Sequence, residues 1–226
     1  MIAVASKVVS TCERRLVELG QVRVTKAARR VSRKWKLDQR LAALVVQEAD
    51  EILGGVRGFV LTFKKGVLTA NAGIDLKNCP PGSAMLWPED ADASAVRLRK
   101  SLERKSGARL GVIVVDSRVT PLRLGTVGLA IGVSGLAPVT DHRGTSDIYG
   151  RRVRVTRTNV ADDLASSAHL LMGETGERIG VVVVRKAPVQ LRHAGDSRTA
   201  LLNVSRCLIA SNLARPPKLP SQVGRF

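Results

Sequence analysis

The sequence lacks the features of a membrane, secreted or zinc-binding protein. No apolar run approaches the roughly 20 residues that a membrane helix needs. The first ten residues carry Lys7 and lead to no small-residue cleavage site. The three cysteines, Cys12, Cys79 and Cys207, are too widely spaced for a disulfide framework or a zinc site. We therefore expect a cytoplasmic protein from a reducing compartment, with no membrane partner.

Aromatic and acidic side chains are also scarce. Two Trp, one Tyr and three Phe leave few platforms on which single-stranded nucleic acid could stack. There are 37 Lys and Arg against 19 Asp and Glu, which sets the net charge at +18, and the excess is strongest in residues 26–36 and 151–157. Such charge suits a nucleic-acid surface, a solvated face or a field for small anions. The sequence contains no helix-turn-helix or zinc-finger pattern, so a solvated face or a field for small anions is favoured over a nucleic-acid surface.

The composition is otherwise that of a globular chain, because 44% of its 226 residues are hydrophobic. Strand and helix signals alternate irregularly, so the sequence predicts an α+β fold of mixed sheets with packed helices. Strands are expected at residues 2–9, 57–63, 67–70, 110–115, 128–135, 153–156 and 180–185. A basic helix or excursion is expected at 21–36, a loop at 71–88, and helices at 37–53, 93–105, 160–172 and 198–213. Asp92 is expected to cap the helix at 93–105.

Oxygen-bearing side chains stand in three places where a chain poor in acids could build a site. Asp75 lies in a loop rich in Gly and Asn, Asp116-Ser117 follow an apolar run, and Glu174 follows a predicted helix between glycines. Each alone is better explained as a turn or cap residue. Together they suggest a metal–phosphate site, because carboxylate and hydroxyl oxygens suit hard divalent cations. His169 is interpreted as a partly buried helix residue instead.

The same residues belong to a series of motifs in a constant order. One of them is Asn71-Ala-Gly-Ile-Asp75-x-x-Asn78, and further matches lie at 6–10, 86–95, 112–123, 128–135, 141–151, 160–165, 171–174 and 181–185. Over residues 2–186 the chain resembles the F420-0:γ-glutamyl ligases, also called coenzyme F420-0:L-glutamate ligases. This resemblance divides the chain into a ligase-like domain at 1–186, a helical extension at 187–214 and a loose basic tail at 215–226.

The resemblance implies an activity and a set of partners. Such an enzyme adds L-glutamate to the precursor of coenzyme F420, a deazaflavin with a phosphodiester and a terminal carboxylate. GTP would phosphorylate that carboxylate, and the amine of glutamate would attack the acyl phosphate. The resemblance also implies divalent cations (Mg²⁺ or Mn²⁺, possibly with K⁺) and an intertwined homodimer.

The resemblance assigns roles to individual residues of this chain. Asp75 and Asp116 would hold one divalent cation, and Ser117 and Glu174 the second. The nucleotide would be contacted by Ser6, Lys7, Asn78 and the loop of Met172, Gly173, Glu174, Thr175, Gly176, Glu177, Arg178 and Ile179.

The chain departs from the family pattern at several positions. The resemblance implies a further segment before the first strand, and we expect this segment to be missing here. Thr11 stands in place of a lysine, Val119-Thr120 in place of Gly-Arg, and Lys186 in place of a glycine. Each lost cation removes a charge-assisted contact worth roughly 1.5–3 kcal/mol. The alternative interpretation is therefore a diverged, weakly active or non-catalytic relative that binds nucleotides or polyanions.

Overall fold

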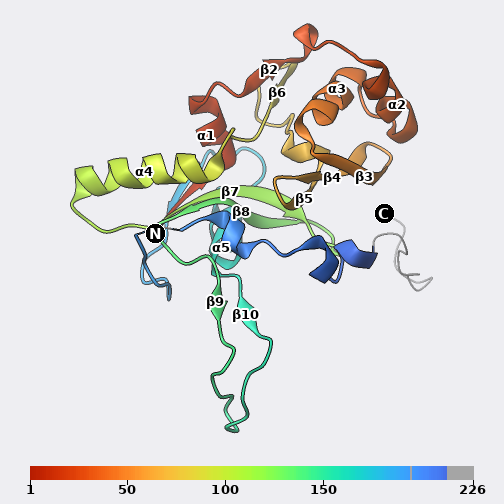
Figure 1. The fold of residues 1–226 in the computed structure, drawn as a ribbon. Coiled ribbons are helices and arrows are strands. Elements are labelled where there is room, and N and C mark those ends of the chain that lie inside the picture. Colours follow the sequence, from red (N-terminus) through yellow and green to blue (C-terminus); the bar gives the residue numbers. More distant parts are fainter. Residues whose placement is uncertain (194, 213–226) are drawn as a thin grey trace.

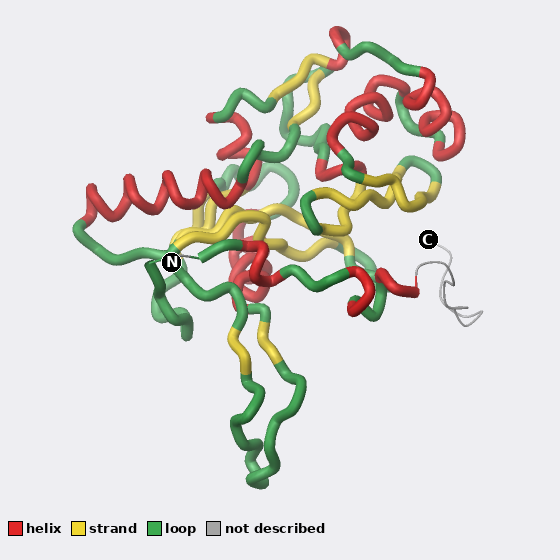
Figure 2. Tube along the Cα trace, in the orientation of Figure 1, coloured by secondary structure: helices red, strands yellow, loops and turns green. Residues whose placement is uncertain are grey.

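The protein is built around a mixed sheet (Figures 1 and 2). In the computed structural model, which describes residues 1–193 and 195–212, the four strands have the order β11-β1-β7-β8. β1 (Ile2–Ala5) runs parallel to β7 (Val112–Val119), whereas β8 (Thr126–Ser134) and β11 (Val181–Val183) pair antiparallel to their neighbours. The predicted α+β class of mixed sheets and packed helices is thus confirmed.

Two helices bury opposite faces of this sheet. The side chains of Val112 and Val114 pack on the side of α4 (Ala91–Ser106), and those of Ile113 and Val115 on the side of α5 (Val160–Met172). This follows from the two-residue side-chain period of a strand. Both faces are therefore buried at the first four residues of β7, which explains why residues 112–115 form a continuous apolar run.

Glycines on β8 bring both helices close to the sheet. A Cβ at Gly128 would lie within 2.3 Å of the Ala165 carbonyl oxygen on α5, and one at Gly132 within 2.3 Å of the Ala91 carbonyl oxygen on α4. Both contacts are to backbone, which cannot yield as a flexible side chain would. The Gly-interrupted strand in the sequence is thus a strand whose missing side chains make room for helices.

A second layer holds its own core. α2 (Lys26–Trp35) and α3 (Gln39–Glu48) pack with the antiparallel sheet β3-β4-β5, formed by Glu51–Val56, Phe59–Lys64 and Val67–Ala70. α1 (Ser6–Cys12) and the short pair of β2 (Leu16–Glu18) and β6 (Ser83–Met85) connect this layer to the central sheet. Single-turn 3-10 helices lie at Leu19–Gln21 and Asn71–Gly73.

Two segments leave the packed body. Residues 140–158, here called the arm, run out and back between β9 (Thr140–Asp141) and β10 (Arg157–Thr158), as Figure 2 shows. Residues 197–212, here called the strap, contain the 3-10 turns Ser197–Ala200, Val204–Arg206 and Ala210–Asn212. Within the described ranges no helix is long and apolar enough to cross a bilayer.

Several predicted elements are confirmed. The hairpin of 57–63 and 67–70, the basic helix within 21–36, and the strands at 110–115 and 128–135 all exist with small changes of boundary. The helix at 160–172 has the predicted bounds, and its cap Asn159 accepts a hydrogen bond from the Asp162 N–H. Gly173 ends it, as expected for a glycine with a positive φ of 70°.

Other elements differ from the prediction. The strand at 2–9 ends at Ala5, and the strand at 180–185 is an edge strand in which only Val182 is buried. The helix at 37–53 stops at Glu48, and its last residues form β3 instead. The strand at 153–156 is wrong, because only Arg157–Thr158 pairs there.

The C-terminal prediction and one helix cap also change. The helix at 198–213 is replaced by the 3-10 turns of the strap, and residues 213–226, including the predicted tail at 215–226, lie outside the described residues. Asp90 rather than Asp92 caps α4. Asp92 accepts hydrogen bonds from the Val133 N–H at 2.7 Å and from Ser197, so it fastens the strap to the sheet.

Candidate functional site

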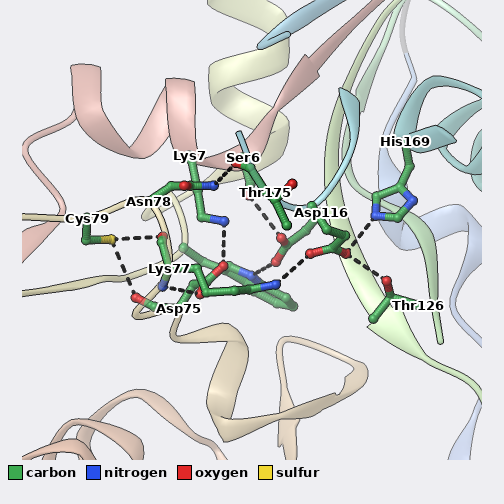
Figure 3. Close-up of polar contacts among 12 residues, drawn as sticks. Ser6, Lys7, Asp75, Lys77, Asn78, Cys79, Asp116, Thr126, His169 and Thr175 are labelled. Atoms are coloured by element: carbon green, nitrogen blue, oxygen red, sulfur yellow. Dashed lines mark hydrogen bonds and ion pairs between the residues drawn. The ribbon is translucent and has the colours of Figure 1, made fainter. Parts of the chain in front are cut away.

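The predicted site residues gather where the first strand meets the first helix (Figure 3). β1 ends at Ala5, and α1 begins at once with Ser6 and Lys7. Ser6 Oγ donates a hydrogen bond to Asp116 Oδ1 at 3.1 Å, while Lys7 Nζ lies 2.5 Å from Asp75 Oδ2. Two neighbouring residues thus connect two carboxylates that are 41 positions apart in the chain.

Asp116 lies inside β7 rather than after its end, which corrects the expected position. One carboxylate oxygen accepts from Ser6 and the other from the indole N–H of Trp87. Burial raises the pKa of Asp116, because the removal of water outweighs the bonds from its donors. Ser117 is the next residue of the strand, so its side chain faces the α5 side, opposite to Asp116.

Asp75 is held by a rigid loop. Asn71 and Ala72 both have positive φ, and the buried Asn71 side chain accepts a hydrogen bond from the Val60 N–H at 2.9 Å. Asp75 then forms an isolated β-bridge with Met85, and its carboxylate accepts from the Lys77 N–H at 2.7 Å. The Asn-Ala-Gly-Ile-Asp motif therefore positions this carboxylate through its backbone.

Glu174 forms the other side of the site. Lys77 Nζ donates to it at 2.8 Å, Thr126 Oγ1 donates at 2.7 Å, and His169 Nε2 lies 2.9 Å from Oε1. Partial burial raises the pKa of this carboxyl, but these three partners outweigh it and lower the pKa to about 2. Glu174 is therefore a stable anion that the fold supplies with donors.

The loop after α5 is joined to the Asp75 loop. Asn78 Nδ2 donates to the Thr175 carbonyl oxygen at 2.8 Å, and the Glu177 carboxylate accepts from the Thr175 N–H at 2.8 Å. From Gly173 to Ile179 the loop is exposed or half-exposed, whereas the Met172 side chain is buried in the core beneath α5. The structure therefore brings together two of the predicted nucleotide-contacting segments but turns Met172 inward.

Sequence reasoning missed four members of this cluster, namely Lys77, Trp87, Thr126 and His169. Trp87 lies inside the matching segment 86–95, so the resemblance marked its position without giving it a role. Lys77 stands at an unspecified position of the Asn71–Asn78 motif, and the motif gave no sign of its contact with Glu174. Thr126 and His169 carried none, because their contact with Glu174 depends on how α5 packs beside β8.

The carboxylates do not converge on one point. Among residues 1–193 and 195–212, no three His, Cys, Asp or Glu side chains lie close enough to hold a single metal ion. Asp75 and Glu174 are instead each paired with a lysine, Lys7 and Lys77 respectively. The arrangement is two separate oxygen sites flanked by two ammonium groups, which suits the binding of a polyanion.

The chain is similar in sequence to proteins of one family. Residues 1–186 match the family model described as F420-0:Gamma-glutamyl ligase. The "Coenzyme F420:L-glutamate ligase" of Methanopyrus kandleri is 36% identical over 201 residues, which cover 88% of this chain and 80% of the relative. The proteins of that name from Methanocaldococcus jannaschii and Archaeoglobus fulgidus are both 37% identical, over 84% and 82% of this chain and 76% and 74% of their own lengths. The chain therefore belongs to the F420-0:γ-glutamyl ligase family.

Proposed function

We propose that this protein ligates L-glutamate to the precursor of coenzyme F420 with GTP as the phosphoryl donor. The observation that carries the proposal is the meeting of Ser6 and Lys7 with Asp75 and Asp116 in a chain of this family. The γ-phosphoryl group would pass from GTP to the acceptor carboxylate, leaving GDP. The glutamate amine would then attack the acyl carbon, forming the amide and releasing phosphate.

The donor set suits divalent cations such as Mg²⁺ or Mn²⁺. Asp75 with Asp116, and Ser117 with Glu174, would each offer hard oxygen atoms on one side of a cation. Mg²⁺ commonly takes only one or two carboxylates and completes its shell with phosphate and water. Two cation sites with two protein ligands each therefore need no cluster of three ligating side chains, and the described part of the chain contains no such cluster. When bound, the cations would neutralise charge on the triphosphate.

The chain's own residues would bind and orient the substrates. Lys7 and Lys77 are placed to pair with phosphate oxygens, and Asn78 fixes the loop that follows α5. Trp87 and Ser6 hold the Asp116 carboxylate in one orientation through its two oxygens. Because positioning and charge neutralisation supply most of the catalysis in phosphoryl transfer, these residues together with the cations would serve the first step.

The proposal is tested by product analysis. The protein is incubated with F420-0, L-glutamate, GTP and Mn²⁺, and the coenzyme is examined by mass spectrometry. We expect a product heavier by one glutamyl residue that needs all four components and appears with GDP and phosphate. The absence of this product under every combination of nucleotide and divalent metal would overturn the proposal.

We also propose that two copies associate through the arm. Ile148 and Tyr149 at its tip are 90% and 76% exposed, and Val155 is 81% exposed. A two-stranded ribbon has little stability of its own in water. A second copy of the chain would bury these apolar side chains and order the ribbon. The supporting observation is that the arm leaves the body that the rest of the chain forms (Figure 1).

The association is tested by light scattering after gel filtration. We expect a dimer for the intact chain and a monomer when residues 143–155 are replaced by a short Gly-Asn turn. The same shortening should leave the far-ultraviolet circular dichroism of the body nearly unchanged. A monomeric intact chain, or a shortened chain that still dimerises, would contradict the role of the arm.

A second candidate function is polyanion binding by the basic helix. α2 and its flanks present an exposed cationic surface made of Arg23, Lys26, Arg29, Arg30, Arg33, Lys34, Lys36 and Arg40. Binding of duplex DNA should then weaken with a log–log salt slope near −0.9 per phosphate neutralised. Exchange of Arg29, Arg30 and Arg33 for Gln should reduce that slope. Binding that is absent, or unchanged in this variant, would exclude the basic helix as such a surface.

A further inference from the structure

A large apolar cavity lies beside the candidate site. Its volume is about 1530 Å³, above the roughly 300–1,000 Å³ of ordinary ligand pockets. The walls come from the β4–β5 hairpin, from the connection between β7 and β8, and from the strap. Leu68, Leu129, Ile131 and Leu201 are among the apolar side chains that face it. The strap is fixed across it by Ser197, which is bonded to Asp92, and by Leu201, which packs on Gly66.

Trp87 forms a common wall between this cavity and the carboxylates. The residue lines the cavity, yet its indole N–H donates to Asp116. β7 provides a second connection, because Asp116 and Arg118 lie on the same face of the strand, about 7 Å apart along it. A ligand that occupies the cavity could therefore extend one end to the carboxylates.

Arg118 supplies a cation with free hydrogen-bonding capacity at this place. Its guanidinium pairs with Asp162 at 3.2 Å, but its Nε–H is buried and has no partner among the described residues. The Arg118 side chain as a whole is 35% exposed and lines the cavity, so the guanidinium N–H groups that Asp162 does not occupy can donate to an acceptor of a bound ligand. An anionic group beside an apolar body would satisfy both Arg118 and the walls.

We infer that the cavity binds the planar deazaflavin body of the acceptor, with its phosphodiester at Arg118 and its terminal carboxylate directed towards Asp116. This inference rests on the proposed function and names where one substrate lies. GTP and glutamate are too polar for these apolar walls, whereas the acceptor combines a wide aromatic ring with an anionic tail.

The cavity is tested by filling it from the strap. Ala200 lines the cavity within an exposed 3-10 turn, and its neighbour Thr199 is exposed and does not line it. Binding of F420-0 is measured by fluorescence anisotropy without nucleotide or glutamate. We expect Ala200→Trp to weaken binding at least about tenfold and the matched Thr199→Trp to change it less than about twofold. Equal affinities of the two variants would overturn the inference.

The anion contact is tested separately. Arg118→Gln should weaken the binding of F420-0 about tenfold, the loss of one charge-assisted contact. It should not change the binding of the neutral deazaflavin that lacks the phosphodiester tail. Lys100→Gln, an exposed charge on α4, serves as the control and should affect neither ligand. Weakening of both ligands by Arg118→Gln would contradict the phosphodiester contact.

Failure of this inference differs from failure of the proposed function. Suppose that the wild-type chain makes the glutamylated product, and that Ala200→Trp and Thr199→Trp have the same KM for F420-0. The deazaflavin ring then lies outside the cavity, and the ligase assignment stands. If the wild-type chain makes no product, the proposed function fails. A wild-type chain that does not bind F420-0 in the binary titration overturns the cavity inference.

Discussion

The central sheet and the arm belong to one chain but are stabilised in different ways. In β7 the side chains of Val112, Ile113 and Val114 are at most 1% exposed, because helices of the same chain cover both faces. In the arm, Ile148 is 90% exposed, and the ladder of β9 and β10 pairs two residues on each side, followed by one isolated bridge between Ser146 and Arg152. Packing within the chain therefore stabilises the sheet, whereas the apolar side chains of the arm are exposed and would need a second surface to bury them.

The largest expected difference between the sheet and the arm is in the rate of amide hydrogen exchange. In dilute protein, amides of residues 113–115 should exchange at least about a thousandfold more slowly than those of residues 146–152, since core strands open only by global unfolding. Raising the protein concentration should protect the arm if a second copy covers it. Equal protection in the two regions at high dilution would contradict the comparison.

The next largest effect should come from a substitution that pushes α5 away from the central sheet and lowers the unfolding free energy. Gly128→Ala places a methyl group within 2.3 Å of the Ala165 carbonyl oxygen, so we expect a loss of about 3 kcal/mol in unfolding free energy. Gly20→Ala is the control, because no atom lies within 4 Å of its Cβ position. Urea unfolding measures both variants. If both variants lower the unfolding free energy by a similar small amount, α5 does not pack closely on β8.

The buried pair of Glu48 and Lys64 extends the comparison to the second layer. Lys64 is nearly buried, and its Nζ donates to Glu48 at 2.7 Å, so Glu48→Gln leaves a buried charge poorly paired. We expect a loss of about 2 kcal/mol at pH 7, while Glu51→Gln, an exposed control, should change little. Urea unfolding again measures the difference, and a neutral Glu48→Gln variant would contradict the role of the pair.

The pH dependence of this pair has a defined sign. Burial raises the pKa of Glu48, but its bonds and charge interactions with Lys64 and Arg15 outweigh burial and hold it below 4.5. A depressed folded-state pKa stabilises the protein above the unfolded value, and this stabilisation is lost as the pH falls through the folded value. The gap between wild type and Glu48→Gln should therefore shrink below about pH 4.5. A constant gap would show that the carboxylate charge is not what stabilises the pair.

Much of the sheet was predictable because its signals are local. The apolar run that ends at Val115 and the glycines of the following segment specify a strand buried on both sides, and Asn159 with Gly173 brackets α5. The early end of the strand at Ala5 was not predictable, because the helical backbone of Ser6 depends on the contact with Asp116. Nor was the strap, whose position depends on a bond between Ser197 and the distant Asp92.

The candidate site was predictable in part for the same reason. Asp75, Asp116 and Glu174 stand out because acids are scarce, and family resemblance supplied Ser6, Lys7 and Asn78. Trp87 and His169 were not found, because their roles arise from tertiary contacts with Asp116 and Glu174. That Asp116 and Ser117 face opposite sides became visible only once the strand was seen to continue to Val119.

The smallest predicted effect concerns Lys186, just after β11. Its φ of 53° lies in the left-handed region, where a residue with a Cβ is strained by roughly 1 kcal/mol. A left-handed φ is consistent with the glycine that the resemblance places at this position. Lys186→Gly should therefore raise the unfolding free energy by up to about 1 kcal/mol, measured by urea unfolding. A loss of stability would show that the lysine side chain makes a compensating contact.

The central claim is that the carboxylates around α1 form the active site, and the turnover of Asp116→Asn tests it most directly. With F420-0, GTP, Mn²⁺ and L-glutamate, we expect this variant to lose at least about a hundredfold of the rate of glutamate addition while it unfolds at the wild-type temperature. Asp163→Asn, an exposed acid on α5, should retain the wild-type rate within about twofold. Equal rates for the two variants would contradict the claim.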